Sequence, residues 1–362
     1  MSVQETNLKA IADAIKAKTG ETGTIKASEF ASKISTIETG IDTSDATATA
    51  SDVVSGMTGY ANNQKVIGTL IPIEKPRWTQ TTLPASVDWS SVCYGNGKFV
   101  AVSGGMDGIS AYSTDGINWS KSNVRGFNMS SVCYGAGKFI AVSTDGSMFS
   151  SPNGINWTPM PLTGGLSRAW SSVCYGNGKF VAVTVNYTDV VAYSIDGITW
   201  IQATLPASKD WYSVCYGNGK FVAVANDSNI AAYSTDGINW TRTTIPVDTN
   251  WESICYGNGK FVAVAYSSDI AAYSADGINW TQTTLPYEGF WHSICYGNGK
   301  FVAVADSSDI AAYSTDGINW TQTTMPVNTL WLSVCYGNGK FVAVADFSNV
   351  AAYLKDSFDS WA

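Results

Sequence analysis

One motif, C-Y-G-[N/A]-G-K-F, is repeated seven times in this chain and constrains its fold more than any other feature. A fixed period of this length is typical of a chain built from stacked structural units, each of which buries its apolar surface against its neighbours. The fold can therefore be predicted from a single copy. Successive copies lie 40 or 41 residues apart, with their cysteines at Cys93, Cys133, Cys174, Cys215, Cys255, Cys295 and Cys335.

The copy that begins at Trp251 has the pattern of four β-strands. Its first two apolar runs flank Asn258-Gly259, and an Asn-Gly turn between apolar runs is the strongest short-range signal for a β-hairpin. A second tight turn is expected at Asp276-Gly277, and Pro286 is expected to close the last strand. No segment of the copy shows the apolar period of a helix. The expected strands are residues 251–256, 261–265, 270–273 and 280–284.

Four antiparallel strands in about 40 residues are typical of one blade of a β-propeller. The tryptophans that open each fourth strand bound seven intervals, so the sequence predicts a mainly β fold with a seven-bladed propeller over residues 76–362. The large side chains of all the tryptophans in the repeats, those of the first strand included, are expected to fill the space between blades. Because the last copy ends within its fourth strand, residues 77–83 are predicted to complete the seventh blade and close the ring, leaving no open strand edge. The tryptophans that open the fourth strands are Trp78, Trp119, Trp157, Trp200, Trp240, Trp280, Trp320 and Trp361.

The turn before the fourth strand carries the pattern S-T-D-G-I-N-W, which begins at Ser113 and resembles the Asp-box, or BNR, repeat of sialidase-like propellers. The resemblance implies a structural role for its aspartate, and an aspartate at a tight turn accepts hydrogen bonds from nearby backbone N–H groups. The second copy has Asn153 in this place, and the seventh copy, residues 354–361, departs further. The aspartates of the matching copies are Asp115, Asp196, Asp236, Asp276 and Asp316.

The first 75 residues differ in composition from the repeats, because they contain neither tryptophan nor cysteine. Apolar residues at helical spacing predict a helical N-terminal region over residues 1–39, in which Gly20 ends the first helix and Ser28 precedes a second helical face. Residues 40–75 are predicted to form a polar linker and a small hairpin that turns at Asn62-Asn63.

Two segments of this region, residues 7–20 and 45–69, are similar to modules in tail proteins from phages and prophages of Gram-positive bacteria. The resemblance implies a tail-fibre or tailocin-like part of the virion, assembled in the bacterial cytoplasm, that docks on tail or baseplate proteins through its N-terminus. Tail fibres of this kind are often homotrimers. The sequence holds no sustained heptad seam, so the oligomeric state stays open.

Charge and cysteine usage exclude several kinds of partner and cofactor. The net charge of −8 argues against non-specific binding to nucleic acid or to an anionic membrane. No apolar run approaches the roughly 18–20 residues that span a bilayer, and no secretory signal is apparent. The cysteines occupy equivalent places in separate copies, too far apart for disulfides, and are expected to be free, buried thiols suited to a reducing cytoplasm. With His292 as the only histidine, no metal site and no cofactor is predicted.

The seven copies differ from one another mainly in two connections. The turns between the first and second strands and between the third and fourth scarcely change, and propeller topology places both on one rim of the ring. The other two connections diverge, and they carry carboxylate, amide and aromatic side chains that suit the hydroxyls and apolar faces of sugars. Because loops on a rigid scaffold commonly bind ligands, this variable rim is predicted to bind a cell-surface glycan. The predicted ligand-binding residues are Asp88, Asp107, Tyr187, Asp189, Asp210, Asp227, Tyr266, Tyr287, Asp306 and Phe347.

Drift at an exposed rim is the alternative explanation of this variation, and a structural tail or baseplate decoration without a ligand is the alternative function. An Asp-box glycosidase is less favoured. Sialidase-like enzymes use three arginines, a tyrosine nucleophile with a glutamate, and an aspartate. The propeller region has only Glu252 and Glu288, and nothing in the sequence pairs two carboxyl groups for acid–base work. The chain is therefore predicted not to be an enzyme.

Overall fold

The computed structural model describes residues 3–19, 26, 58–61, 64–67, 77–105, 108–123, 128–162 and 165–355. The chain divides into two compact units, one formed by Met1–Lys75 with Phe358–Ala362 and the other by Pro76–Ser357. The predicted second helical face, the polar linker, Asp107 and Trp361 lie outside the described residues. No helix in the described part of the chain is long and apolar enough to cross a membrane.

The first unit contains a helix and a hairpin. Helix α1 (Val3–Thr19) ends directly before Gly20, as the sequence predicted, and buries Ala12 and Ile15 on one face. On its exposed face Lys9 Nζ lies 2.6 Å from Asp13 Oδ2, one helical turn away. Strands β1 (Thr58–Ala61) and β2 (Gln64–Ile67) pair antiparallel, with Ala61 opposite Gln64. The predicted hairpin is therefore present.

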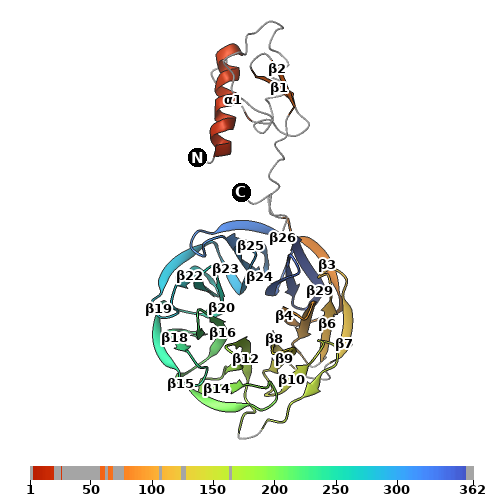
Figure 1. Ribbon diagram of the computed structural model, residues 1–362, viewed down its shortest axis with the longest axis vertical. Coiled ribbons are helices and arrows are strands. Elements are labelled where there is room, and N and C mark those ends of the chain that lie inside the picture. Colours follow the sequence, from red (N-terminus) through yellow and green to blue (C-terminus); the bar gives the residue numbers. More distant parts are fainter. Residues whose placement is uncertain are drawn as a thin grey trace. The chain divides into compact units, whose positions relative to one another are not determined.

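The second unit is a ring of antiparallel sheets, each running from the centre of the ring toward its outer edge (Figure 1). Each copy of the repeat contributes strands that we name A, B, C and D from the innermost outward. The A strands are β4 (Trp89–Gly95), β8 (Met129–Gly135), β12 (Trp170–Gly176), β16 (Trp211–Gly217), β20 (Trp251–Gly257), the second half of β23 (Thr281–Gly297) and β27 (Trp331–Gly337).

The B and C strands follow in sheet order. The B strands are β5 (Lys98–Ser103), β9 (Lys138–Ser143), β13 (Lys179–Thr184), β17 (Lys220–Ala225), β21 (Lys260–Ala265), β24 (Lys300–Asp306) and β28 (Lys340–Ala345). The C strands are β6 (Ile109–Ser113), β10 (Met148–Ser151), β14 (Thr188–Ser194), β18 (Ser228–Ser234), β22 (Ser268–Ser274), β25 (Ser308–Ser314) and β29 (Ser348–Lys355).

The D strands lie at the outer edge of the ring. They are β7 (Ser120–Asn123), β11 (Thr158–Pro159), β15 (Ile201–Lys209), β19 (Thr241–Thr249), the first half of β23, β26 (Thr321–Thr329) and β3 (Thr79–Val87). In the described ring, five sheets have four strands, and one has seven because β23 pairs with β22 through its first half and with β24 through its second.

The expectation that Pro286 closes the fourth strand is wrong, because strand β23 continues through it to Gly297. Strands β3, β15, β19 and β26 run through their prolines in the same way. A shift in register allows this. In β19 the pairs Ile230↔Thr244 and Ser228↔Thr249 enclose extra residues, so the proline, which has no N–H to donate, falls within a bulge. Most segments that the sequence analysis treated as loops leading into strand A are therefore extended strand.

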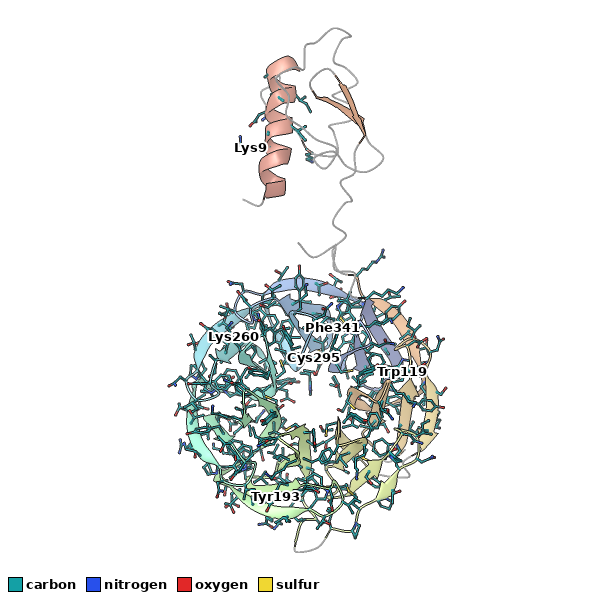
Figure 2. All side chains as sticks on the ribbon, in the orientation of Figure 1. Lys9, Trp119, Tyr193, Lys260, Cys295 and Phe341 are labelled. Atoms are coloured by element: carbon teal, nitrogen blue, oxygen red, sulfur yellow. The ribbon has the colours of Figure 1, made fainter. Side chains whose placement is uncertain are left out.

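Apolar side chains fill the space between neighbouring sheets (Figure 2). The A-strand tryptophans of six copies are fully buried, and Met129 takes their place in the second copy with 1% exposure. Trp89, for example, lies in one cluster with Val342 and Val344 of the last copy. The prediction that tryptophans fill these spaces is confirmed for the A strands. The indole N–H groups of five of these six tryptophans, all but Trp170, also hold the preceding segment, as in the 3.0 Å bond from Trp251 Nε1 to Val247 O.

The last copy of the repeat meets the first. Strand β3 pairs with β29, with Thr79 opposite Tyr353 and Val87 opposite Ser348. The A strands also touch in sequence around the ring, because the tyrosine of each copy lies against the glycine of the copy before it. A Cβ added to Gly95 would lie 2.1 Å from Tyr134 Cγ, and one added to Gly337 would lie 2.1 Å from Tyr94 Cγ. The first contact joins the first two copies and the second joins the last copy to the first.

All seven cysteines carry free thiols, but only Cys255 and Cys335 are fully buried. The other five are half-buried, which corrects the expectation of buried thiols throughout. Figure 2 shows Cys295 toward the inner edge of the ring. Burial raises the pKa of the Cys174 thiol well above its usual range, so this thiol stays protonated and is a poor nucleophile.

Candidate binding site on the variable rim

The A–B and C–D turns form what we call the invariant rim, and their constancy has a structural cause. Asn258, in an A–B turn, has a φ of 43° and donates a hydrogen bond of 3.0 Å from Nδ2 to Thr315 O in the C–D turn of the next copy. Asn338 donates the same bond, of 3.1 Å, to Thr114 O of the first copy. Each asparagine thus supplies both a tolerated positive φ and a link between neighbouring copies.

The Asp-box aspartates lie in the C–D turns of the invariant rim. Asp276 Oδ1 accepts hydrogen bonds from the backbone N–H groups of Ile278 (2.9 Å) and Asn279 (2.8 Å), and Oδ2 accepts one from Asn279 Nδ2 (2.8 Å). Burial acts to raise the pKa of Asp276, but these bonds outweigh it and hold the pKa well below its usual range. Asn153 makes the same two backbone bonds at 2.9 Å in the second copy. The carboxylate therefore organises its own turn.

The B–C turns and the segments leading into strand A form the variable rim, and a repeated backbone bond holds the two together. Gly104 N donates to Asp88 O (2.6 Å), Tyr266 N to Asn250 O (2.8 Å) and Asp346 N to Leu330 O (2.8 Å). Asn226 N and Val185 N make the equivalent bonds to Asp210 O and Ala169 O. The two divergent connections thus lie side by side, and their side chains form one surface in each copy.

Two aromatic side chains project from the B–C turns. Tyr187 and Phe347 have φ values of 51° and 47°, a region that bulky residues rarely occupy. Ser267 and Ser307 occupy the same place in two other copies with φ values of 58° and 53°. The turn therefore has no structural need for an aromatic ring. Tyr187 is 62% exposed and Phe347 is 71% exposed, so neither contributes much to the core.

Several of the other predicted rim residues come together in pairs. Asp210 Oδ1 accepts a bond of 2.7 Å from Tyr187 N, so its carboxylate supports the neighbouring turn. Tyr187 and Asp189 line a hollow of about 420 Å³ that also includes Arg168. Tyr287 and Asp306 line another, of about 220 Å³. The carboxylate of Asp227 is exposed, and its backbone oxygen accepts a bond of 3.3 Å from Lys209 Nζ.

The densest group of polar and aromatic side chains surrounds Tyr266. Its hydroxyl lies 3.5 Å from Asp306 Oδ2, its ring centroid lies 5.0 Å from that of Phe290, and it meets the ring of His292 edge-on at 5.5 Å. His292 Nδ1 in turn lies 3.4 Å from Glu252 Oε1. Glu252 and His292 follow the strand-A tryptophans of neighbouring copies, and Phe290 precedes one. Residues 40 positions apart in the sequence thus form one cluster.

The sequence analysis identified Tyr266 and Asp306 but missed Glu252, His292 and Phe290. A signal was present in the residue that follows each strand-A tryptophan or its replacement Met129. This residue is serine in the first three copies and changes in the last four. A comparison of loops does not reveal this position, because it lies within strand A. In order, the seven residues are Ser90, Ser130, Ser171, Tyr212, Glu252, His292 and Leu332.

Burial sets the protonation of this cluster. The Glu252 side chain is 11% exposed, and burial together with the nearby charge of Asp306 raises the pKa of its carboxyl to about 8. Burial lowers the pKa of His292 against the opposing effect of Asp306. Burial also raises the pKa of Asp346 to about 6, with Asp88 and Asp306 contributing and the backbone N–H of Phe347 opposing. Near neutral pH, a protonated carboxyl therefore lies beside a neutral imidazole.

Other ligand chemistries find less support in the described part of the chain. No group of three or more His, Cys, Asp or Glu side chains there is arranged to hold a metal ion. The arginines that a sialidase-like site would need are not gathered there either. Arg168 lines a hollow on the variable rim, Arg242 lies on the outer strand β19, and Arg77 precedes the outer strand β3.

Comparisons with known proteins bear on the fold. No family model matches the chain, and no curated protein matches it. It is similar in structure to virginiamycin B lyase from Staphylococcus aureus, with 11% identity and a TM-score of 0.70 over 78% of this chain and 99% of that one. It is similar to YCF48 from Cyanidioschyzon merolae, with 13% identity and a TM-score of 0.60 over 77% and 98% of the two chains. The WD40 propeller domain of Doa1 gives 17% identity and a TM-score of 0.61 over 80% and 100%. At these identities the likeness shows the fold alone: a mainly β chain with a β-propeller of four-stranded antiparallel sheets.

Proposed function

We propose that this protein is a phage tail-fibre or receptor-binding component that binds a glycan on the surface of a Gram-positive cell through the variable rim of its propeller. In this proposal residues 1–75 dock on tail or baseplate proteins, as the resemblance of that region to phage tail proteins implies, and the virion is its location. Several propellers on one particle would raise the overall avidity without tight binding at any single site.

One observation carries the glycan-binding part of the proposal. Of the eight large apolar or aromatic side chains that are exposed in the described residues, five are aromatic; four of these belong to the variable rim, and the fifth, Tyr212, is the second residue of strand β16. Exposed aromatic rings suit the apolar face of a sugar ring. Neighbouring carboxylates and serines supply acceptors and donors for sugar hydroxyls. The five are Tyr187, Tyr212, Tyr287, Phe290 and Phe347.

Two finer assignments of the fold belong to the same proposal. We count the seven-stranded sheet as two blades that share β23, which gives a seven-bladed ring. Its support is the set of seven glycine–tyrosine contacts that begins at Gly95 and returns from Gly337 to Tyr94. We also assign the C–D turns to the Asp-box type, on the pattern of the sequence and the bonds accepted by Asp276.

The proposal assigns binding without catalysis. Virginiamycin B lyase is an enzyme by name, and the pair of Glu252 and His292 makes acid–base chemistry the second candidate function. A protonated carboxyl 3.4 Å from an imidazole nitrogen is able to donate a proton while the imidazole accepts one. A structural tail decoration without a ligand is the third. Release of product from glycans incubated with the chain would favour the second candidate, and a Glu252→Gln variant that retains full release would exclude that pair.

The test of the proposed function is binding of the full chain, fluorescently labelled, to a panel of Gram-positive cells and to their isolated wall glycans. We expect strain-selective binding that one purified glycan competes. Changing Tyr187 and Phe347 together to serine, the residue of two other copies at that place, should weaken binding at least tenfold without lowering the melting temperature. The matched control is Ile195→Thr on the invariant rim, where Thr114 and Thr235 occupy the same place.

The possible outcomes separate the candidates. Loss of binding in the double serine variant and retention in the control supports the variable rim as the glycan site. Full retention in both variants places the site elsewhere. Absence of binding to every strain by the folded chain would contradict the proposal and favour the structural role.

A further inference from the structure

The residue that follows the strand-A tryptophan, or Met129 in the second copy, has a structural use in the first three copies. Each strand A has a bulge at this place, where the register with strand B shifts. Ser90 Oγ donates a hydrogen bond of 2.6 Å to Met129 O of the next copy, and Ser130 Oγ donates one of 2.6 Å to Trp170 O. Ser171 donates to Trp211 O at 2.5 Å. Serine here therefore links one copy to the next.

Four consecutive copies replace this serine with larger residues, namely Tyr212, Glu252, His292 and Leu332. Leucine has no group that can make the bond, and the carboxyl of Glu252 lies against His292, with Oε1 3.4 Å from Nδ1. The fold does not require these replacements, because serine at this position links neighbouring copies. Burying the carboxyl of Glu252 there instead costs desolvation free energy. The replacement points to a ligand at this place.

In the described part of the chain, these carboxyl groups face no lysine or arginine, and the basic side chain beside Glu252 is the neutral imidazole of His292, 3.4 Å away. Asp306 is 9% exposed and Glu252 is 11% exposed at its side chain. Among the described residues, no lysine or arginine forms an ion pair with Glu252 or Asp306. Both carboxyl groups are held near each other in a poorly solvated place without a counter-charge. A cationic group bound here would supply the missing counter-charge.

Aromatic rings lie beside these carboxyl groups. Tyr266 lies between Phe290 and His292, with ring centroids 5.0 Å and 5.5 Å away, and its hydroxyl reaches Asp306. Phe290 also lines the hollow of about 220 Å³ together with Asp306. The faces of such rings attract an ammonium group by cation–π interaction, worth about 0.5–2 kcal/mol. Carboxylates with aromatic walls form the environment that ammonium groups prefer.

We propose that the Glu252 cluster, which comprises Tyr212, Glu252, Tyr266, Phe290, His292 and Asp306, binds an ammonium group carried by the cell-surface glycan. The proposal rests on the proposed function and specifies its ligand. Both a primary ammonium, as on an amino sugar, and a quaternary ammonium, as on a choline substituent, have the required charge and size. A neutral sugar without such a group would supply no positive charge to the buried carboxyl groups.

The protonation of Glu252 gives the proposal a distinctive signature. With a pKa raised to about 8 by burial and by Asp306, this carboxyl is mostly protonated at pH 7 in the free protein. An ammonium ion beside it favours the carboxylate and lowers its pKa. Binding should therefore release up to one proton, and affinity should rise between pH 6 and pH 8, by about tenfold per pH unit at most.

The experiment is calorimetric titration of the full chain with two matched pairs of probes. Choline is compared with 3,3-dimethylbutan-1-ol, its neutral isostere, and glucosamine with N-acetylglucosamine. We expect one charged probe to bind at least tenfold more tightly than its neutral counterpart, with proton release seen as a difference in heat between two buffers at pH 7. Which charged probe binds better distinguishes a quaternary from a primary ammonium.

Variants test the site without disturbing the fold. Glu252→Ser restores the residue of the first three copies, so the chain should fold, lose at least tenfold in affinity for the charged probe and release no proton. Asp306→Asn should also weaken binding, whereas Asp309→Asn, an exposed residue three positions away, is the control. Equal binding of charged and neutral probes, or unchanged binding by Glu252→Ser, overturns the proposal.

The cell-binding assay keeps this proposal distinct from the proposed function. If the labelled chain binds cells and neither choline nor glucosamine competes, the ammonium proposal fails while receptor binding stands. If the chain binds the charged probe through Glu252 but binds no cell, the Glu252 cluster is confirmed as an ammonium site and the receptor-binding function fails.

Discussion

At the scale of single residues, Glu252 departs most from what the fold requires. The first three copies satisfy the same place with serine, at no cost in buried charge. Glu252 instead places a carboxyl where water is scarce, 3.4 Å from His292, and its pKa rises to about 8. A buried group of this kind leaves a measurable trace in the pH dependence of stability, because its proton affinity differs between the folded and unfolded chains.

We expect Glu252→Gln to flatten the loss of stability at alkaline pH. The folded pKa of about 8 lies above the unfolded value near 4.5, so the stability that this carboxyl contributes is complete below about pH 4.5 and is lost as the pH rises through 8. Between pH 7 and pH 9 the wild-type chain should lose about 1–2 kcal/mol more than the variant. Urea unfolding at both pH values measures the difference. Glu288→Gln, an exposed glutamate, is the control and should behave as wild type; an identical loss in Glu252→Gln would show that Glu252 titrates normally.

The sequence identified only part of this cluster, and the reason is physical. Tyr266 and Asp306 fall in segments between the second and third strands that differ between copies, so a comparison of these connections found them, although Asp306 is the last residue of strand β24. Glu252 and His292 stand within strands, each in a separate copy, and only the ring brings them within 3.4 Å of each other. Their protonation also depends on burial, which the sequence does not reveal. The single histidine and one of two propeller glutamates therefore looked unrelated until they were placed in space.

At the scale of strands, the contacts between A strands depend on glycine for two different reasons. Gly217 ends strand β16, and a Cβ there would lie 2.0 Å from Cγ of Tyr256 in the next copy. Gly219, two residues later in the A–B turn, has a φ of 74° and no atom within 4 Å of an added Cβ. The first glycine is required for close approach and the second for its backbone conformation.

This contrast predicts different costs for two alanine substitutions. Gly217→Ala should destabilise the chain by roughly 3 kcal/mol or more, because the Tyr256 ring lies on the strand and the two copies must separate to admit a methyl group. Gly219→Ala should cost only about 1–2 kcal/mol, the penalty of a left-handed conformation in an L-residue. Urea unfolding of both variants measures the free energies of unfolding. A larger loss in Gly219→Ala would mean that the tyrosine contact contributes little.

The presence of the strands was largely predictable from the sequence, but the residues at which they end were harder to predict. Apolar runs separated by Asn-Gly and Asp-Gly turns gave the four strands of each copy. The continuation of the fourth strand through Pro286 was not foreseen, because proline normally ends the pairing of a strand. The register shift that accommodates the proline is accompanied by a contact from the next A strand, whose tryptophan bonds the backbone four residues earlier, as Trp251 does to Val247. That contact lies in tertiary structure and has no local signal.

At the scale of the whole ring, stability should depend on the pairing of its two chain ends. Strand β3 pairs with β29 at five positions and brings Trp78 and Leu83 into the core, with 3% and 2% exposure. Without β3, strand β29 would expose its unpaired backbone edge, and the apolar surface beneath Leu83 would meet water. An open ring has two strand edges, each of which can pair with another chain.

Two truncated chains test this closure. A chain that starts at residue 76 should melt like the full chain, whereas one that starts at residue 88 should melt roughly 10 °C or more lower, because several kcal/mol of pairing and burial are lost and each kcal/mol shifts the melting temperature of a large domain by about 2–4 °C. Size-exclusion chromatography should show association of the shorter chain through its open edge. A synthetic peptide of residues 76–87 should restore the melting temperature by occupying that edge, whereas a peptide of the same composition in scrambled order should not. Equal melting of both truncated chains would mean that β3 is not needed to close the ring.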